Sequence, residues 1–307
     1  MKILICDKLN SRVKSELETI GSCTDISAVE NKQEALMEEI SDSEIVVIRS
    51  GTTLTEDVLQ HAKVLKIIAR CGVGVDNIDM SYTKENNIKV TNSPAANLLS
   101  VVELTVGLII SLARKIALSD QHVKSSKWER SQFIGTELYG KTLGIVGFGK
   151  AGKLVSSICQ SLGMNIVFYD PFVSDWDGVE KNLELNELLS ISDVVTVHVV
   201  KTKETENLLS KDKLDLLKSN SILINTSRGG VVDEEYLIEL LRENKIYGVG
   251  LDVFSKEPPE NVEEFKNLNI VTTPHIGAST HEAQFKAGMD TVENIKKILS
   301  GDDSAVL

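Results

Sequence analysis

A glycine-rich segment in the middle of the chain has the residue types and spacing of a phosphate-binding turn. Gly147, Gly149 and Gly152 form a G-x-G-x-x-G pattern between a β-forming run and a helical segment. In this context the first glycine permits a tight turn, the second lets the backbone approach a pyrophosphate, and the third lets helix and strand pack closely. The pattern predicts dinucleotide binding at the start of the helix, with Lys150 and Ala151 among the contacts.

An acidic residue stands eighteen residues after the last glycine, at the end of the next β-run. Asp170 is placed to accept hydrogen bonds from ribose hydroxyls. A carboxylate there repels a 2′-phosphate, and Pro171-Phe172 brings no arginine to bind one. The sequence therefore predicts NAD rather than NADP. The alternative is a strand–turn–helix unit without a ligand, which the complete spacing disfavours.

Other polar residues directly follow predicted strands, where ligands bind in open α/β sheets. Arg228 lies in the turn S-R-G-G after a predicted strand. An arginine beside glycines at a strand end is poorly placed for a structural salt bridge, whereas its planar fork of donors suits the carboxylate of a ligand. His275 follows Pro274, and the unperturbed pKa of histidine suits acid–base chemistry. Alone, His275 would more often be structural and Glu257 a solvated loop carboxylate.

The elements that carry these residues alternate between β-rich runs and helical stretches, which is typical of parallel sheets built from βαβ units. We expect an α/β protein with two doubly wound parallel-sheet domains. The predicted strands cover residues 2–6, 44–50, 65–72 and 87–93 in one series, and 142–149, 165–170, 193–200, 221–227, 247–254 and 269–275 in the other.

Two helical features accompany the strands. A single helix is predicted over about 98–123, and its apolar residues on most sides predict burial in a core or between subunits. A capping box from Thr53 to Glu56 is predicted to begin another helix.

Length and composition narrow the class of protein. A chain of 307 residues is long enough for two domains, and a net charge of −12 argues against nucleic acid and anionic membranes as partners. Four scattered cysteines without a C-x-x-C pair give no support to a metal site and indicate a reducing cytoplasm. No signal peptide is recognised, and the longest apolar run is too short to span a membrane.

Three segments, at 224–235, 250–259 and 273–280, resemble the D-isomer-specific 2-hydroxyacid dehydrogenase family. Further segments, at 49–55, 69–79, 91–105, 127–130 and 133–138, are similar to the branch that oxidises 3-phospho-D-glycerate to 3-phosphohydroxypyruvate with NAD. The resemblance covers essentially the whole chain.

The resemblance implies a particular domain arrangement. A Rossmann-type NAD-binding domain at 96–282 would be inserted into a flavodoxin-like substrate domain made of 1–95 and 283–307. It also implies a homodimer or homotetramer with the long helix in the interface. Because the chain ends at Leu307, the C-terminal regulatory domain that some relatives carry is expected to be absent.

The resemblance assigns roles to the polar residues at the strand ends. His275 would be the general acid/base that takes the C2 hydroxyl proton, and Glu257 would hydrogen-bond it and raise its pKa. Arg228 would bind the substrate carboxylate and polarise the C2 carbonyl. Asp252 would lie at the nicotinamide end and Val199 on the adenosine side. The remaining cofactor contacts are expected at Val73, Thr226, Ser227, Arg228, His275, Gly277 and Ala278.

Substrate contacts are expected elsewhere in the chain. Backbone N–H groups of Val73 and Gly74 would bind the carboxylate. Arg49 and Arg70, each at the end of a β-run, would bind the substrate's phosphate. Arg130 would reach a neighbouring subunit's site, with ordinary surface charge as the alternative. The local arginines would outweigh a screened negative net charge.

Two other functions fit the same residues. One is reduction of another 2-oxo acid of the glyoxylate, hydroxypyruvate or D-lactate type, which would not need both Arg49 and Arg70. The other is an NAD-sensing binding protein similar to the transcriptional corepressors of this fold, which the catalytic residues alone do not exclude. The preferred prediction is oxidation of a small phosphorylated 2-hydroxy acid.

Overall fold

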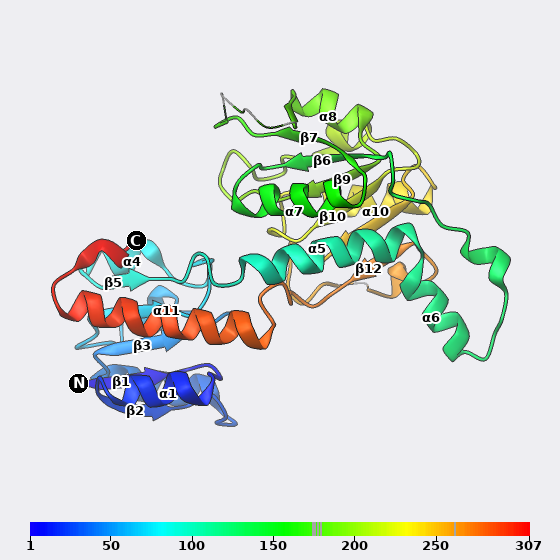
Figure 1. The fold of residues 1–307 in the computed structure, drawn as a ribbon. Coiled ribbons are helices and arrows are strands. Elements are labelled where there is room, and N and C mark those ends of the chain that lie inside the picture. The colour runs from blue at the N-terminus through cyan, green and yellow to red at the C-terminus, as the bar shows by residue number, and fades with distance from the viewer. Residues whose placement is uncertain (174–175, 177, 179, 261) are drawn as a thin grey trace. The chain divides into compact units, whose positions relative to one another are not determined.

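The computed structural model describes residues 1–173, 176, 178, 180–260 and 262–307. The chain forms two compact units, one of Met1–Leu98 with Ala278–Leu307 and the other of Leu99–Gly277. Each unit is built around its own parallel sheet, as the ribbon shows (Figure 1). The predicted fold class, two parallel-sheet α/β domains, is confirmed. The division of substrate and cofactor roles between them stays a prediction.

The first unit contains a five-stranded sheet in the order β2-β1-β3-β4-β5, which is the flavodoxin-like order. Its strands are β1 (Lys2–Ile5), β2 (Ser22–Asp25), β3 (Ile45–Ile48), β4 (Ile67–Arg70) and β5 (Lys89–Thr91). The strand β2 was not predicted from the sequence. This edge strand, SCTD, has no buried residue and therefore no apolar run to reveal it.

Helices cover both faces of this sheet because successive strand residues point to opposite sides. Ile3 and Ile5 pack in one apolar cluster with residues of α1 (Ser11–Glu18) and α11 (His281–Leu299). Leu4 packs in the other with residues of α2 (Lys32–Glu39) and α3 (Glu56–Leu59). The remaining helical elements are α4 (Met80–Glu85) and the 3-10 turns η1 (Ile40–Asp42) and η4 (Asp303–Ala305). The predicted capping box is wrong, because Thr55 is the N-cap of α3 and no side chain caps it.

The second unit contains a seven-stranded parallel sheet in the order β12-β11-β10-β9-β6-β7-β8, a Rossmann order with one additional strand. Its strands are β6 (Thr142–Val146), β7 (Asn165–Tyr169), β8 (Lys181–Asn182), β9 (Val194–Val197), β10 (Ile222–Asn225), β11 (Gly248–Leu251) and β12 (Ile270–Thr272). The strand β8 was not predicted, because its two exposed residues carry no β pattern.

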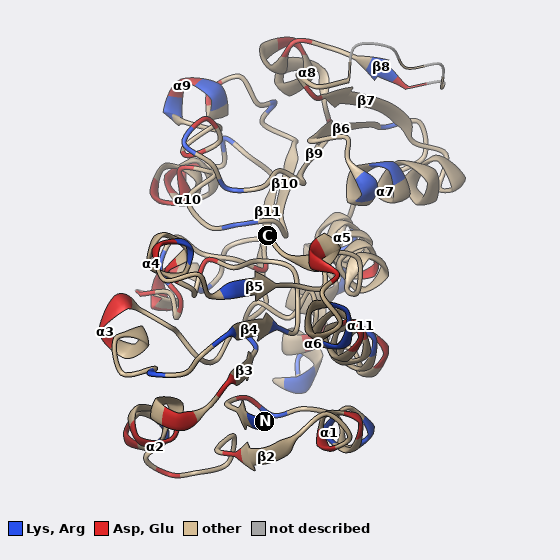
Figure 2. Ribbon diagram, turned by 90° about the vertical axis from the view of Figure 1, so that its left-hand side faces the viewer, with Lys and Arg blue, Asp and Glu red and all other residues tan. Residues whose placement is uncertain are grey.

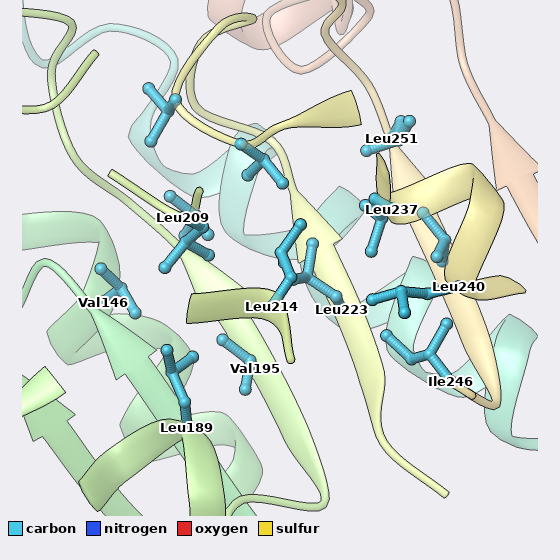
Figure 3. Packing of buried hydrophobic residues seen from close by; sticks show 14 of the residues in the cluster. Val146, Leu189, Val195, Leu209, Leu214, Leu223, Leu237, Leu240, Ile246 and Leu251 are labelled. Atoms are coloured by element: carbon cyan, nitrogen blue, oxygen red, sulfur yellow. The ribbon is translucent and has the colours of Figure 1, made fainter. Parts of the chain in front are cut away.

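Two apolar clusters bury the faces of this sheet. Leu189, Val195, Leu223 and Leu240 belong to the cluster drawn in Figure 3. The helices of the unit are α5 (Leu98–Ala113), α6 (Ile116–Lys124), α7 (Lys150–Ser161), α8 (Leu185–Ile191), α9 (Lys211–Leu214) and α10 (Glu234–Arg242), with 3-10 turns η2 (Arg130–Phe133) and η3 (Val262–Phe265).

The single long helix predicted over 98–123 is wrong, because the structure has two helices there. Lys115 between them adopts the left-handed conformation, with φ of 51°, which an α-helix of L-residues does not continue. The apolar face of α5 is buried in the core of the second unit, whereas none of the residues of α6 is buried. Burial was therefore predicted correctly for α5 alone.

His198 directly follows β9 and is partly desolvated. Its Nε2 lies 3.0 Å from Thr196 Oγ1. Desolvation lowers the pKa of His198 from its ordinary value of 6.5 to about 4. The ring is therefore neutral in the folded chain near pH 7.

Replacing His198 with Asn is expected to reduce the acid sensitivity of the fold. Between pH 6.5 and about 4 the unfolded chain binds a proton at His198 that the folded chain does not, so stability falls as the pH is lowered through this range. Urea midpoints measured from pH 7 to pH 4.5 should fall less steeply in His198→Asn than in the parent chain. The exposed His61→Asn is the control. Equal slopes for His198→Asn and the parent would contradict the prediction.

Candidate active site and cofactor site

The glycine turn after β6 has the geometry that its sequence predicts. Gly147 has φ of 94°, and a Cβ on it would lie 2.7 Å from the carbonyl oxygen of His198. A Cβ on Gly152 would overlap the carbonyl of Gly147, so the helix packs closely on the turn. Gly149 is the N-cap of α7, and no atom lies within 4 Å of the place its Cβ would take. Open space therefore lies at the start of the helix, where a pyrophosphate would approach.

The first residues of α7 add positive charge to this end of the helix. Lys150 and Ala151 begin α7, and basic residues colour its start in Figure 2. The unpaired N–H groups of a helix N-terminus and its dipole favour an anion. The turn and the helix together fit a dinucleotide pyrophosphate.

Asp170, at the end of β7, is held beside the same turn. Its Oδ2 accepts from the backbone N–H of Phe148 at 2.8 Å, and its Oδ1 accepts from that of Phe172 at 2.9 Å. A cavity of about 600 Å³ adjoins it. Among the described residues, the lining contains no Lys or Arg that could bind a 2′-phosphate: Tyr169, Asp170, Pro171, Val173, Asn182, Leu183, Glu184 and Glu187. These residues fit the adenosine end of NAD. Val199 lies beside the same turn, with its Cγ1 3.0 Å from the Cβ position of Gly147.

The turn that carries Arg228 is shaped by Asn225, which the sequence analysis did not single out. The Asn225 side chain is fully buried at the end of β10. Its Oδ1 accepts from the backbone N–H and hydroxyl of Ser227 at 3.0 and 2.8 Å, and its Nδ2 donates to the Arg228 carbonyl at 2.9 Å. Thr226 is buried, with its Oγ1 2.8 Å from Thr105 Oγ1. A polar residue at the end of an apolar strand was the signal that could have revealed Asn225.

His275 and Glu257 lie together, and the hydrogen bond expected between them is present. His275 Nδ1 is 2.8 Å from Glu257 Oε2, with both side chains partly exposed. An ionised Glu257 only accepts, so Nδ1 donates and Nε2 is left to exchange protons. Glu257 Oε1 also accepts from the backbone N–H of Phe254 at 3.1 Å, which fixes the carboxylate. The pair has the arrangement of an oriented acid/base.

Asp252 organises the segment that carries His275. Its buried carboxylate accepts from Thr273 Oγ1 at 2.6 Å and from the backbone N–H groups of Ile276 and Gly277 at 2.7 and 2.9 Å. Asp252 was expected at the nicotinamide, and these contacts were not predicted. Its contact with the cofactor, and that of Ala278, stay predictions.

In the first unit, Arg70, Val73 and Gly74 share the loop that begins at the end of β4. The Arg70 guanidinium lies against Gly72, where a Cβ would overlap it, and its Nη1 donates to the Cys71 carbonyl at 3.1 Å. The Val73 carbonyl accepts from Asn92 Nδ2 at 2.6 Å. The absence of a side chain at Gly72 thus determines where Arg70 lies.

Arg49 follows β3 in the first unit and is positioned by Asp7. The backbone N–H of Arg49 donates to Asp7 Oδ2 at 2.6 Å, while Asp7 Oδ1 accepts from Lys32 Nζ at 2.6 Å. Lys32 Nζ also donates to the Gly51 carbonyl at 3.1 Å. The contacts of Asp7 and Lys32 were not predicted, although an acidic residue two positions after β1 was a signal. Arg130 lies in the second unit, exposed in η2.

Other site types find no support in the part of the chain that the structure describes. No group of three or more His, Cys, Asp or Glu residues there could hold a metal ion. No helix among the same residues is both long and apolar enough to cross a bilayer.

Comparison with known proteins gives consistent matches along the chain. A family model described as "D-isomer specific 2-hydroxyacid dehydrogenase, NAD binding domain" matches residues 106–277. The D-3-phosphoglycerate dehydrogenase of Methanocaldococcus jannaschii is 42% identical over 306 residues, which are 98% of this chain and 58% of that protein. The hydroxypyruvate reductase of Thermotoga maritima is 42% identical over 271 residues, covering 87% of this chain and 89% of that protein. This chain thus spans only about 58% of the length of several of these curated relatives.

A solved structure agrees with these matches. The D-lactate dehydrogenase of Aquifex aeolicus, complexed with NAD and lactic acid, superposes with a TM-score of 0.85 at 28% identity and covers 98% of this chain and 96% of that one. The NAD-binding domain predicted from the glycine turn and Asp170 is therefore confirmed, and the chain belongs to the D-isomer specific 2-hydroxyacid dehydrogenase family.

Proposed function

We propose that this chain oxidises 3-phospho-D-glycerate at C2 to 3-phosphohydroxypyruvate with NAD, the first step of phosphorylated serine biosynthesis. The observation that carries the proposal is the His275–Glu257 pair, joined at 2.8 Å at the end of a sheet whose glycine turn fits a dinucleotide. Relatives named D-3-phosphoglycerate dehydrogenase support the choice of acid.

The roles of the chain's own residues follow from their chemistry. NAD, when bound, supplies the hydride acceptor. His275 takes the proton of the C2 hydroxyl on Nε2, and the Glu257 carboxylate at Nδ1 stabilises the imidazolium that forms. Arg228, on the turn held by Asn225, binds the substrate carboxylate through its guanidinium. In the first unit, the backbone N–H groups of Val73 and Gly74 are further candidate donors for the substrate.

The substrate's phosphate is assigned to Arg49 and Arg70. Lys32 donates to the Gly51 carbonyl in the loop of Arg49, and its charge is paired with Asp7, so the guanidinium of Arg49 supplies the positive charge of this loop. Short-range charge-assisted hydrogen bonds of this kind outweigh the screened field of a chain with net charge −12.

A second candidate is reduction of an unphosphorylated 2-oxo acid such as hydroxypyruvate. The match to the hydroxypyruvate reductase of Thermotoga maritima favours it, because that match covers 89% of the relative's length. The two candidates use the same acid/base and differ in whether a phosphate must be bound.

Replacing His275 with Ala is expected to lower turnover by about 100- to 10,000-fold, because the C2 hydroxyl loses its proton acceptor. Binding of NADH, measured by fluorescence titration, should remain within about twofold of the parent chain, since a residue for proton transfer adds little to cofactor affinity. The exposed His61→Ala is the matched control. Turnover unchanged in His275→Ala would refute the catalytic assignment.

The arginine assignment predicts a loss that depends on the substrate. Arg49→Ala and Arg70→Ala should each lower kcat/KM for 3-phospho-D-glycerate by about 10- to 100-fold, the value of one charged hydrogen bond. Rates with hydroxypyruvate or D-lactate should change far less, and the exposed Arg12→Ala should change neither. Equal losses on both substrate types would contradict the assignment. A parent chain that prefers hydroxypyruvate would favour the second candidate, and one that turns over no acid would favour an NAD-sensing binding protein.

We further propose that the chain assembles as a homodimer or homotetramer. The segment from α6 to β6 exposes a series of large apolar side chains, which is typical of a protein interface. Its members are Ile116, Val123, Trp128, Ile134 and Tyr139. Arg130 lies in the same segment and is proposed to reach the partner's substrate.

Introducing charge into this segment is expected to separate the subunits. Trp128→Asp with Ile134→Asp should shift the sedimentation mass from a multiple of 33.7 kDa to 33.7 kDa, because each carboxylate would have to be desolvated in the interface. Val29→Asp and Val64→Asp, at exposed valines of the first unit, should leave the assembly intact. A parent chain that sediments as a monomer would disprove the proposal.

A cytoplasmic location is proposed from the cysteines. All four are free thiols. Burial raises the pKa of Cys6 to about 12 and that of Cys71 and Cys159 to about 11, so these thiols stay protonated and unreactive.

A further inference from the structure

Arg228 and Glu257 are carried by two loops that are far apart in sequence, one after β10 and one after β11. We propose that Glu234 is a positioning residue for the reaction, whose carboxylate ties these two loops together and holds Arg228 and Glu257 in register. The inference rests on the proposed function, because it gives Glu234 a part in the same site.

The Glu234 carboxylate accepts one hydrogen bond from each loop. Its Oε2 accepts from the backbone N–H of Ser255 at 2.9 Å, and its Oε1 accepts from that of Gly230 at 3.4 Å. Glu234 is the first residue of α10, where a negative charge interacts favourably with the helix dipole. The acidic start of α10 is visible in Figure 2. The side chain is thus anchored by a helix while both of its oxygens hold loops.

The two loops also touch directly, backbone against backbone. A Cβ on Gly229 would overlap the carbonyl group of Phe254. A small shift of either loop is therefore passed to the other, because there is no side chain between them to absorb it. The two hydrogen bonds of Glu234, to Gly230 and Ser255, are one residue away from this contact on each loop.

Each loop transmits its position to a catalytic side chain. The backbone N–H of Phe254, next to Ser255, donates to Glu257 Oε1 at 3.1 Å, and Glu257 Oε2 holds His275. On the other loop, Gly230 is two residues from Arg228, whose carbonyl is fixed by Asn225. Glu234 therefore acts on the acid/base through Ser255, Phe254 and Glu257, and on the carboxylate-binding arginine through Gly230.

The surroundings of Glu234 predict that loss of its two hydrogen bonds moves the loops more than it lowers the stability of the fold. A cavity of about 890 Å³, open to solvent, is lined by Gly230, Glu234, Phe254 and Ser255 among others. Water from this cavity can satisfy both N–H groups when the carboxylate is removed. The loops would then relax at little cost in stability, and a displacement of about 1 Å can cost about 100-fold in rate.

The test compares Glu234→Ala and Glu234→Gln with Glu235→Gln in the same helical turn, where Glu235 is exposed. Glu234→Ala loses both hydrogen bonds, and Glu234→Gln loses one because its NH₂ group cannot accept. The expected fall in kcat/KM is about 10- to 100-fold for Ala, smaller for Gln and less than about twofold for Glu235→Gln. The melting temperature and NADH affinity should stay close to those of the parent chain.

A double variant separates positioning from a general structural role. If Glu234 acts on turnover through Glu257, Glu234→Ala should lower kcat by a smaller factor in the Glu257→Gln background than in the parent chain, because the part of the effect that passes through Glu257 is already lost there. Multiplicative losses in kcat, or full activity in both Glu234 variants, would overturn the inference alone. Full activity of Glu257→Gln by itself would overturn the proposed function and the inference with it.

Discussion

The parallel order of the second sheet is the constraint on which the candidate site depends. In a parallel sheet every strand ends at the same edge, so residues that directly follow different strands come to lie along one line. Gly147, Asp170, Arg228, Asp252 and His275 each follow a different strand of this sheet. Their separation in sequence is large, but the strand pairing from β12 to β7 brings them to a common edge.

Loops at such an edge expose backbone N–H groups that have no strand partner, and buried side chains supply the missing acceptors. Asn225 does so for the Arg228 turn, Asp252 for the segment of His275, and Asp7 for the loop of Arg49. The same hydrogen bonds hold the backbone segments that carry Arg228, His275 and Arg49. Organisation before the substrate binds is what electrostatic catalysis requires, since reorganisation during the reaction costs free energy.

The proposed substrate assignment has to reconcile an anionic ligand with an acidic protein. The chain carries a net charge of −12, yet the residues assigned to the substrate are arginines at or just after the ends of strands. At physiological ionic strength distant charges are screened over about 8 Å, so contacts at hydrogen-bond distance dominate. Net charge therefore limits the partners of the surface as a whole but not the ligand of a local site.

The sequence alone determined the apolar strands, the parallel-sheet class, the glycine turn and Asp170, because these depend on local residue types and spacing. It also indicated the His275–Glu257 pair, although only through the family pattern. The tertiary structure decided β2 and β8, which form by pairing with a neighbouring strand and have no apolar run, and the break at Lys115, which depends on one backbone torsion. It alone revealed the contacts of Asn225, Asp252, Asp7 and Glu234. A buried polar side chain acquires its function from its hydrogen-bond partners, and these partners come from segments whose proximity exists only after the sheets have formed.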